Sequence, residues 1–146
     1  GLRFFTVYGE WGRPDMAPMI FADAIQNNKI LRIFNYGKSY RDFTYISDVI
    51  ESVYKVMNKI YLSNSNTHQV FNVGNSKKIE LMKFINYLEN AFNRKARKEF
   101  FPLQQGDMES TFADCTKLEK YINFKPKTNL KDGIRNFSKW YMEYHN

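Results

Sequence analysis

The sequence is poor in the residue types that build disulfides and metal sites. Its 146 residues include one cysteine, Cys115, and two histidines, His68 and His145. One cysteine cannot form a disulfide within the chain, and no Cys/His cluster has the spacing of metal ligands. We therefore expect no bound metal and, by default, a reducing compartment. No apolar run approaches the roughly 20 residues that a membrane-spanning helix needs, so we expect no membrane partner.

The glycine-rich turns of nucleotide-binding folds are also missing. There is no G-x-G-x-x-G and no Walker-type loop, and Gly9 and Gly12 around Trp11 match neither pattern. Tyr121 and Lys125 have the Tyr-x-x-x-Lys spacing of a proton-transfer pair. Pro126 follows directly and disfavours helical geometry at Lys125, so we interpret this match as chance.

Basic and apolar residues are plentiful. The apolar share of 43% predicts a folded chain, and the formal charge of +7 suggests an anionic partner. That partner could be nucleic acid, acidic lipid or a phosphorylated small molecule, and the charge does not choose among them. Lysine and asparagine are spread throughout, so much of the surplus fits a solvated surface.

Hydrophobic patterning predicts one α/β unit with short strands. We expect extended segments at 2–8, 30–34, 41–46, 69–73 and 97–101, and helices at 16–28, 47–60, 80–92, 114–121 and 130–144. Residues 9–15, 35–39, 63–68, 102–110 and 123–129 read as turns or loops. Asp15 and Asp114 are the predicted caps of the helices that follow them. A helical series of Val49, Val53, Val56 and Ile60 should face the core.

Two arginines are candidates for anion binding. Arg13 follows a glycine loop at a helix start, and Arg41 enters a strand after a turn. The alternative for each is a surface ion pair with its neighbour, Asp15 or Asp42. Asp107 lies in a loop and could accept two hydrogen bonds from a ribose diol, or it could be an ordinary turn aspartate.

Five segments in a fixed order resemble a known family. They are GLRFFTVYGEWGRPDM, FNYGKSYRDFTYISDV, VFNVGNS, QQGDMESTFADCTKL and KDGIRNFSKWY. Together they resemble the C-terminal half of extended short-chain dehydrogenase/reductase sugar-nucleotide epimerases, particularly UDP-glucuronate 4-epimerases. The implied fold is α/β, the substrate-binding portion (1–146) of an extended Rossmann-type epimerase. The chain starts without Met on an apolar run, which suggests the middle of a longer protein, and the resemblance implies that an NAD-binding domain precedes it.

The resemblance also implies roles for individual residues. The family's catalytic Tyr and Lys would lie upstream, so none is expected here. Phe4 and Phe5 would flank the NAD cofactor, and Thr6 would hydrogen-bond the substrate. Glu10 stands where the family usually has proline, but the loop keeps its arginine. The implied substrate-binding residues are Thr6, Arg13, Phe34, Arg41, Gln104 and Asp107: Arg13 near the acidic sugar, Phe34 at the uracil, Arg41 at the diphosphate, and Gln104 and Asp107 at the ribose.

The implied activity is NAD-dependent interconversion of UDP-glucuronate and UDP-galacturonate at C4, in a cytoplasmic enzyme whose full-length form is a homodimer. This chain alone would bind the UDP-sugar and be inactive. The same framework could serve another UDP-sugar epimerase, a dehydratase or a decarboxylase. A different class, a non-catalytic module binding UDP-sugar or nucleic acid, is supported only by the net charge. Galactose epimerases tend to carry arginine in place of Gln104, so the contacts there would be weaker.

Overall fold

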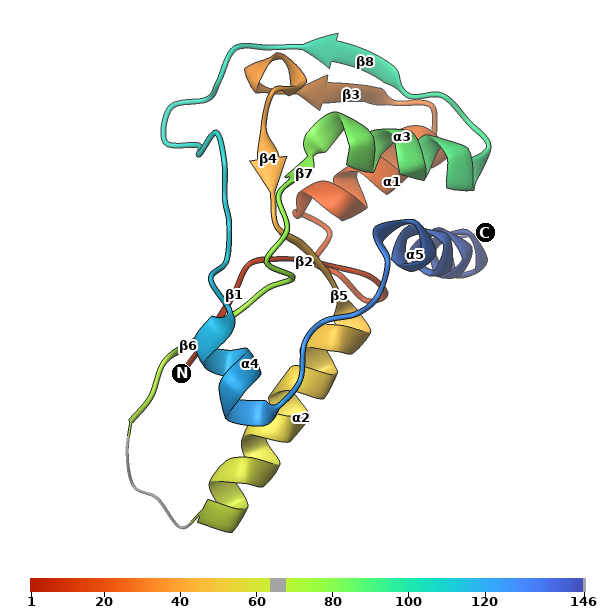
Figure 1. Ribbon diagram of the computed structural model, residues 1–146. Coiled ribbons are helices and arrows are strands. Elements are labelled where there is room, and N and C mark those ends of the chain that lie inside the picture. Colours follow the sequence, from red (N-terminus) through yellow and green to blue (C-terminus); the bar gives the residue numbers. More distant parts are fainter. Residues whose placement is uncertain (64–67, 146) are drawn as a thin grey trace.

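The computed structural model describes residues 1–63 and 68–145 (Figure 1). Most of the predicted 63–68 loop, residues 64–67, therefore lies outside the described residues. The strands are β1 (Leu2–Phe4), β2 (Thr6–Tyr8), β3 (Ile30–Ile33), β4 (Tyr40–Arg41), β5 (Phe43–Tyr45), β6 (Phe71–Val73), β7 (Ile79–Glu80) and β8 (Arg97–Phe100). The helices are α1 (Ala17–Gln26), the 3-10 turn η1 (Asn35–Gly37), α2 (Ile46–Ser63), α3 (Leu81–Phe92), α4 (Thr116–Ile122) and α5 (Leu130–Tyr144). The predicted α/β class is confirmed.

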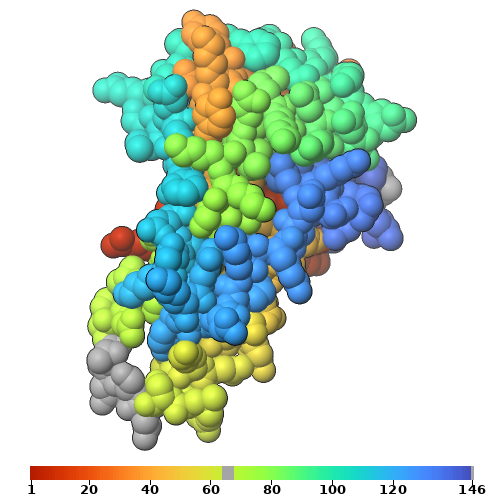
Figure 2. Space-filling model, viewed as in Figure 1, coloured from red at the N-terminus to blue at the C-terminus, as the bar shows by residue number. Residues whose placement is uncertain are grey.

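Two hydrophobic clusters organise the chain. The larger one joins α1, α3 and α5 to β3 and β5 around Phe43 and Phe84, whose rings stack at 4.0 Å. The smaller one packs α2 and α4 on β6 around Val49, Val73 and Leu118. Figure 2 shows the corresponding upper and lower parts of the molecule, with residues of the 101–115 connection running between them.

The strands form pairs that connect distant parts of the chain. β1 pairs with β6, β2 with β5 and β3 with β8, all parallel, while β4 and β7 are antiparallel. The predicted single strand at 2–8 is therefore wrong in one respect, because it is two strands with a break at Phe5. The Phe5 amide donates to the backbone carbonyl of Val73, and the Thr6 amide donates to the backbone carbonyl of Asp42. The extended segment therefore changes its pairing strand at this point.

The prediction is wrong for the N-cap of α1 and for the burial of the last predicted core residue of α2. Asp15 does not cap α1, because Met16 holds the N-cap position and the Asp15 carboxylate binds Arg13. Pro18 lies in the first turn as expected. On α2, Val49 and Val56 are buried, but Ile60 is 52% exposed because the end of the helix extends beyond the smaller cluster.

The C-terminal third follows the prediction closely. The exception is the predicted cap of α4: the Asp114 carboxylate accepts a hydrogen bond from the Thr116 amide at 3.0 Å, but Cys115 holds the N-cap position. α4 ends at Ile122, so Tyr121 and Lys125 do not share a helix. In the part of the chain that the structure covers, no helix combines the length and apolarity needed to cross a membrane.

Candidate ligand-binding cleft

Four predicted ligand residues line one cleft of about 530 Å³. Thr6 comes from β2, Phe34 from the end of β3, Arg41 from β4, and Asp107 from the loop between β8 and α4. The folding of separate segments brings them together. The remaining walls are Asp15, Met16, Ala17, Ile20, Phe21, Ile30, Arg32, Ser39, Phe43 and Leu81. We call this the ligand cleft.

Arg41 is held by three acceptors. Its Nη2 donates to Asp107 Oδ1 at 2.8 Å, and its Nη1 donates to the carbonyls of Tyr40, at 2.9 Å, and Glu109, at 3.3 Å. The side chain is 19% exposed. The ion pair suggested with Asp42 is wrong, because the partner of Arg41 is Asp107. The guanidinium is thereby fixed at the cleft wall, with further donors able to meet a ligand.

Asp42 instead organises the backbone behind the cleft. Its side chain is fully buried and accepts hydrogen bonds from the amides of Asn75, at 2.8 Å, and Ala113, at 3.1 Å. Burial raises the pKa of Asp42, and the nearby amides oppose that shift. A side chain at Gly74 would place a Cβ 2.5 Å from Ala113 Cβ and 3.2 Å from the carboxylate, so this junction requires glycine. Sequence reasoning missed this role, because the partners of Asp42 at Asn75 and Ala113 are distant in the sequence.

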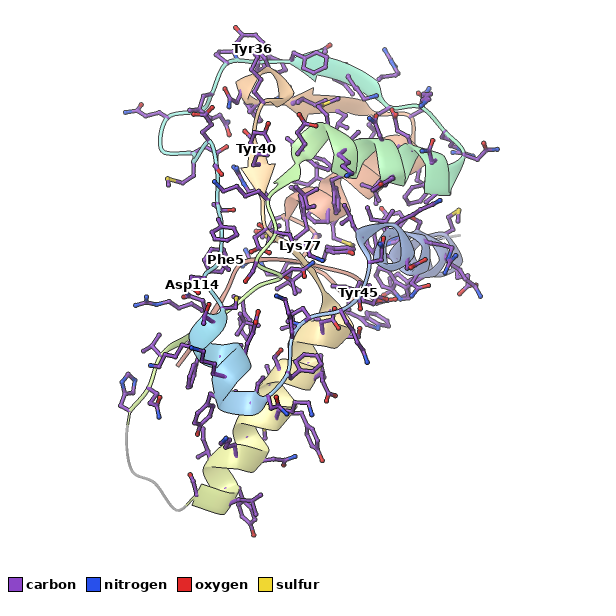
Figure 3. All side chains as sticks on the ribbon, in the orientation of Figure 1. Phe5, Tyr36, Tyr40, Tyr45, Lys77 and Asp114 are labelled. Atoms are coloured by element: carbon purple, nitrogen blue, oxygen red, sulfur yellow. The ribbon has the colours of Figure 1, made fainter. Side chains whose placement is uncertain are left out.

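Phe34 closes the end of the cleft at β3. Its ring lies 5.7 Å from the ring of Phe101, which follows the paired strand β8. Asn35, Tyr36 and Gly37 then adopt positive φ in the tight turn η1, so the chain reverses toward β4. Figure 3 shows Tyr36 at this turn and Tyr40 below it on β4.

A second cavity of about 380 Å³ lies beside the ligand cleft. Phe4, Phe5 and Arg13 line it, and Met16 lines both cavities. Phe4 is 52% exposed. This cavity therefore holds Phe4 and Phe5, which were predicted to flank the cofactor, and Arg13, which was predicted to lie near the sugar. Thr6 and Arg41 line the ligand cleft instead.

Arg13 forms an ion pair with Asp15, as the alternative interpretation of the sequence predicted. Its Nη2 lies 2.5 Å from Asp15 Oδ2 and its Nε 3.1 Å from Oδ1, a two-pronged contact between exposed side chains. The guanidinium holds the pKa of Asp15 below its usual range.

Glu10 fixes the loop that carries Arg13. The Tyr45 hydroxyl donates to Glu10 Oε1 at 2.6 Å. Burial, and then the Glu10 carboxylate, raise the pKa of Tyr45 to about 12. At Gly9, φ is +139° and a Cβ would overlap Ile46, so glycine is required where the loop begins.

Gln104 is the predicted site residue that lines neither cavity. It is exposed, and its carbonyl accepts the Asp107 amide at 3.1 Å, closing the turn that contains Gly106. Its observed contact is thus with the backbone of that turn. Among residues 1–63 and 68–145, no group of three or more His, Cys, Asp or Glu side chains could hold a metal ion.

Residues 5–137 match the family model described as GDP-mannose 4,6 dehydratase. The chain belongs to this family. Among curated relatives, an uncharacterized protein of Methanocaldococcus jannaschii is 46% identical over 143 residues, covering 98% of this chain and 42% of that protein. A probable UDP-glucuronate 4-epimerase of Rhizobium meliloti is 40% identical over 153 residues, covering 95% of this chain and 45% of that protein.

A solved structure gives the same picture. UDP-glucuronic acid 4-epimerase from Bacillus cereus, in complex with UDP-glucuronic acid and NAD, superposes with a TM-score of 0.87 at 30% identity. The match covers 98% of this chain and 45% of that chain, and it falls in the C-terminal portion of the Rossmann-type fold. The chain thus spans less than half the length of the relatives it matches.

Proposed function

We propose that this chain is the substrate-binding part of an NAD-dependent UDP-glucuronate 4-epimerase. One observation carries the proposal: Thr6, Phe34 and Arg41, together with Asp107, line a single cleft although four different segments supply them. The Bacillus cereus epimerase, whose solved complex holds UDP-glucuronic acid and NAD, supports the choice of ligand.

In this proposal, the ligand cleft anchors the nucleotide. Arg41 would bind the diphosphate, since a guanidinium fork suits phosphate oxygens, and Asp107 would accept from the ribose hydroxyls. The two residues form an ion pair with each other, which orients the guanidinium and the carboxylate at the cleft. Gln104, whose turn carries Asp107, would assist at the ribose.

The second cavity would receive the reacting end of the complex. Phe4 and Phe5 would provide apolar walls beside the cofactor, and their place in that cavity fits a flat ring. Thr6 and Arg13 would hold the acidic sugar from its two sides. When bound beside Phe4 and Phe5, NAD would supply the hydride-transfer chemistry at C4 of the sugar. The chain itself would keep the nucleotide end fixed while the sugar turns.

We propose further that an NAD-binding domain precedes this chain in the whole protein. Four exposed apolar side chains recur at helical spacing on α2, at Ile50, Tyr54, Met57 and Tyr61. We call them the α2 stripe. Large exposed apolar surfaces generally meet a partner. The relatives are more than twice as long as this chain. The additional part of such a protein would cover the α2 stripe and the exposed Phe4.

A substrate panel tests the proposed reaction. The intact protein is incubated with NAD and, separately, UDP-glucuronate, UDP-glucose, UDP-N-acetylglucosamine or GDP-mannose, and the products are separated by chromatography. We expect conversion of UDP-glucuronate to UDP-galacturonate and little turnover of the neutral sugars. Equal turnover of UDP-glucose and UDP-glucuronate would contradict the acidic-sugar assignment, and dehydration of GDP-mannose would contradict the epimerase assignment.

A further inference from the structure

The strand β3 presents alternate residues to the ligand cleft. Leu31 and Ile33 are buried in the larger cluster, at 0% and 1% exposure. Ile30, Arg32 and Phe34 therefore share the opposite side, and all three line the cleft. Arg32 thus reaches the same cleft as Arg41, from the strand on the far side of the η1 turn.

Arg32 differs from the other arginines that line the two cavities in its contacts to the described residues. Within residues 1–63 and 68–145, its guanidinium makes no side-chain hydrogen bond and no ion pair, whereas Arg41 binds Asp107 and Arg13 binds Asp15. Its register neighbour on β8, Glu99, does not form an ion pair with it. The five N–H donors of Arg32 are available to a ligand.

The surroundings of Arg32 suit a flat ring better than a phosphate. The apolar side chains that line the cleft from these segments are Ala17, Ile20 and Phe21 of α1, Ile30 of β3, and Phe34 directly after β3. Ser39 and Arg41, which could donate several hydrogen bonds to a phosphate, come from the segment after the turn. An apolar wall with one planar donor group favours a heterocycle that stacks and offers acceptors.

We propose that Arg32 is a specificity-determining residue that recognises the nucleobase, an inference that rests on the proposed nucleotide-sugar function. A guanidinium only donates hydrogen bonds. Uracil and cytosine share the carbonyl at C2, but at C4 uracil carries a carbonyl oxygen where cytosine carries an amino donor. Arg32 donates to the oxygen at C4 and so selects uridine nucleotides over cytidine nucleotides, while Arg41 binds the phosphates that both share.

Calorimetric titration of UDP and CDP into the intact protein tests this assignment. We expect the wild type to prefer UDP, and Arg32→Met to weaken UDP binding about 10-fold, the loss of one good hydrogen bond, with CDP almost unchanged. Arg97→Met is the matched control, because Arg97 is an exposed arginine on the paired strand β8 and lines neither cavity. It should leave both affinities unchanged.

Three results would overturn the inference. An equal loss for UDP and CDP in Arg32→Met would make Arg32 a general phosphate contact. No loss for either nucleotide would mean that Arg32 does not touch the ligand. If the wild type binds neither nucleotide, the proposed function itself is refuted. This result is distinct from a failure of the Arg32 assignment, because it is measured on the wild type without any substitution.

Discussion

Arg41 and Asp107, 66 residues apart in the sequence, are joined by a hydrogen-bonded ion pair of 2.8 Å at the wall of the ligand cleft. Asp107 Oδ1 also accepts the Met108 amide at 2.8 Å, so the carboxylate is held from its own loop as well. The pair connects β4 to the irregular segment between β8 and α4. Two residues predicted to bind different parts of one ligand therefore also bind each other.

Arg41→Met should weaken UDP binding to the intact protein by about 10- to 100-fold, since it removes charge-assisted contacts to phosphate. The dependence of binding on salt should also become shallower. Calorimetric titration at two salt concentrations measures both effects. Arg135→Met, which removes an exposed arginine of α5 that lies outside both cavities, is the control. Equal affinities for wild type and Arg41→Met would contradict the assignment.

Glu89→Gln should lower the free energy of unfolding at neutral pH by about 2 kcal/mol, the typical value of hydrogen bonds to a buried charge. The Glu89 carboxylate is 1% exposed and accepts from the Ala96 amide and from Lys98 and Lys95. Burial alone would raise its pKa, but these donors outweigh burial and the net shift is downward from 4.5.

The sign of that shift fixes the pH dependence. Because the folded pKa of Glu89 lies below the unfolded value of 4.5, its stabilisation is complete above about pH 4.5 and is lost as the pH falls through the folded pKa. Urea unfolding at several pH values should show wild type and Glu89→Gln converging in acid. A stability difference that stays constant from pH 7 to pH 3 would be inconsistent with this account.

Tyr45→Phe should loosen the loop between Gly9 and Met16, because it removes the 2.6 Å hydrogen bond to Glu10. Amide hydrogen exchange in that loop should become faster, and the free energy of unfolding should fall by about 1–2 kcal/mol. Tyr54→Phe, at a tyrosine that is 60% exposed on α2, should change neither quantity. Unchanged exchange in Tyr45→Phe would show that the loop is held by other contacts.

Met57→Lys should reduce the binding of a hydrophobic dye to the 146-residue chain, because Met57 is 62% exposed in the middle of the α2 stripe. Asn58→Lys adds the same charge at an exposed position next to the stripe and should have little effect. In a longer protein whose preceding domain covers the stripe, Met57→Lys should instead destabilise the fold. Identical dye binding by the two variants would argue against a continuous apolar surface.

Local patterning predicted much of this fold because helices and turns depend on near neighbours. The apolar face of α3 and the bounds of α5 follow from local spacing alone. The break at Phe5 could not be predicted, since it arises where one strand changes from β6 to β5. The exposure of Ile60 likewise depends on how far the smaller cluster extends.

The residues of the candidate site could be predicted only in part, because several of their contacts depend on tertiary structure. The resemblance pointed to Arg41 and Asp107, and folding brings them into one cleft, but their mutual ion pair depends on tertiary structure. The burial of Asp42 depends on amides more than 30 residues away, at Asn75 and Ala113. Arg32 has no motif of its own, and only its place on the cleft side of β3 distinguishes it.

Hydrogen–deuterium exchange of the intact protein with and without UDP-glucuronate tests the central claim most directly. The account predicts protection on binding in two separate segments, residues 30–41 and 104–110, which carry Phe34, Arg41 and Asp107. Protection confined to other segments, or no protection at a saturating concentration of UDP-glucuronate, would contradict the claim that this cleft binds the nucleotide sugar.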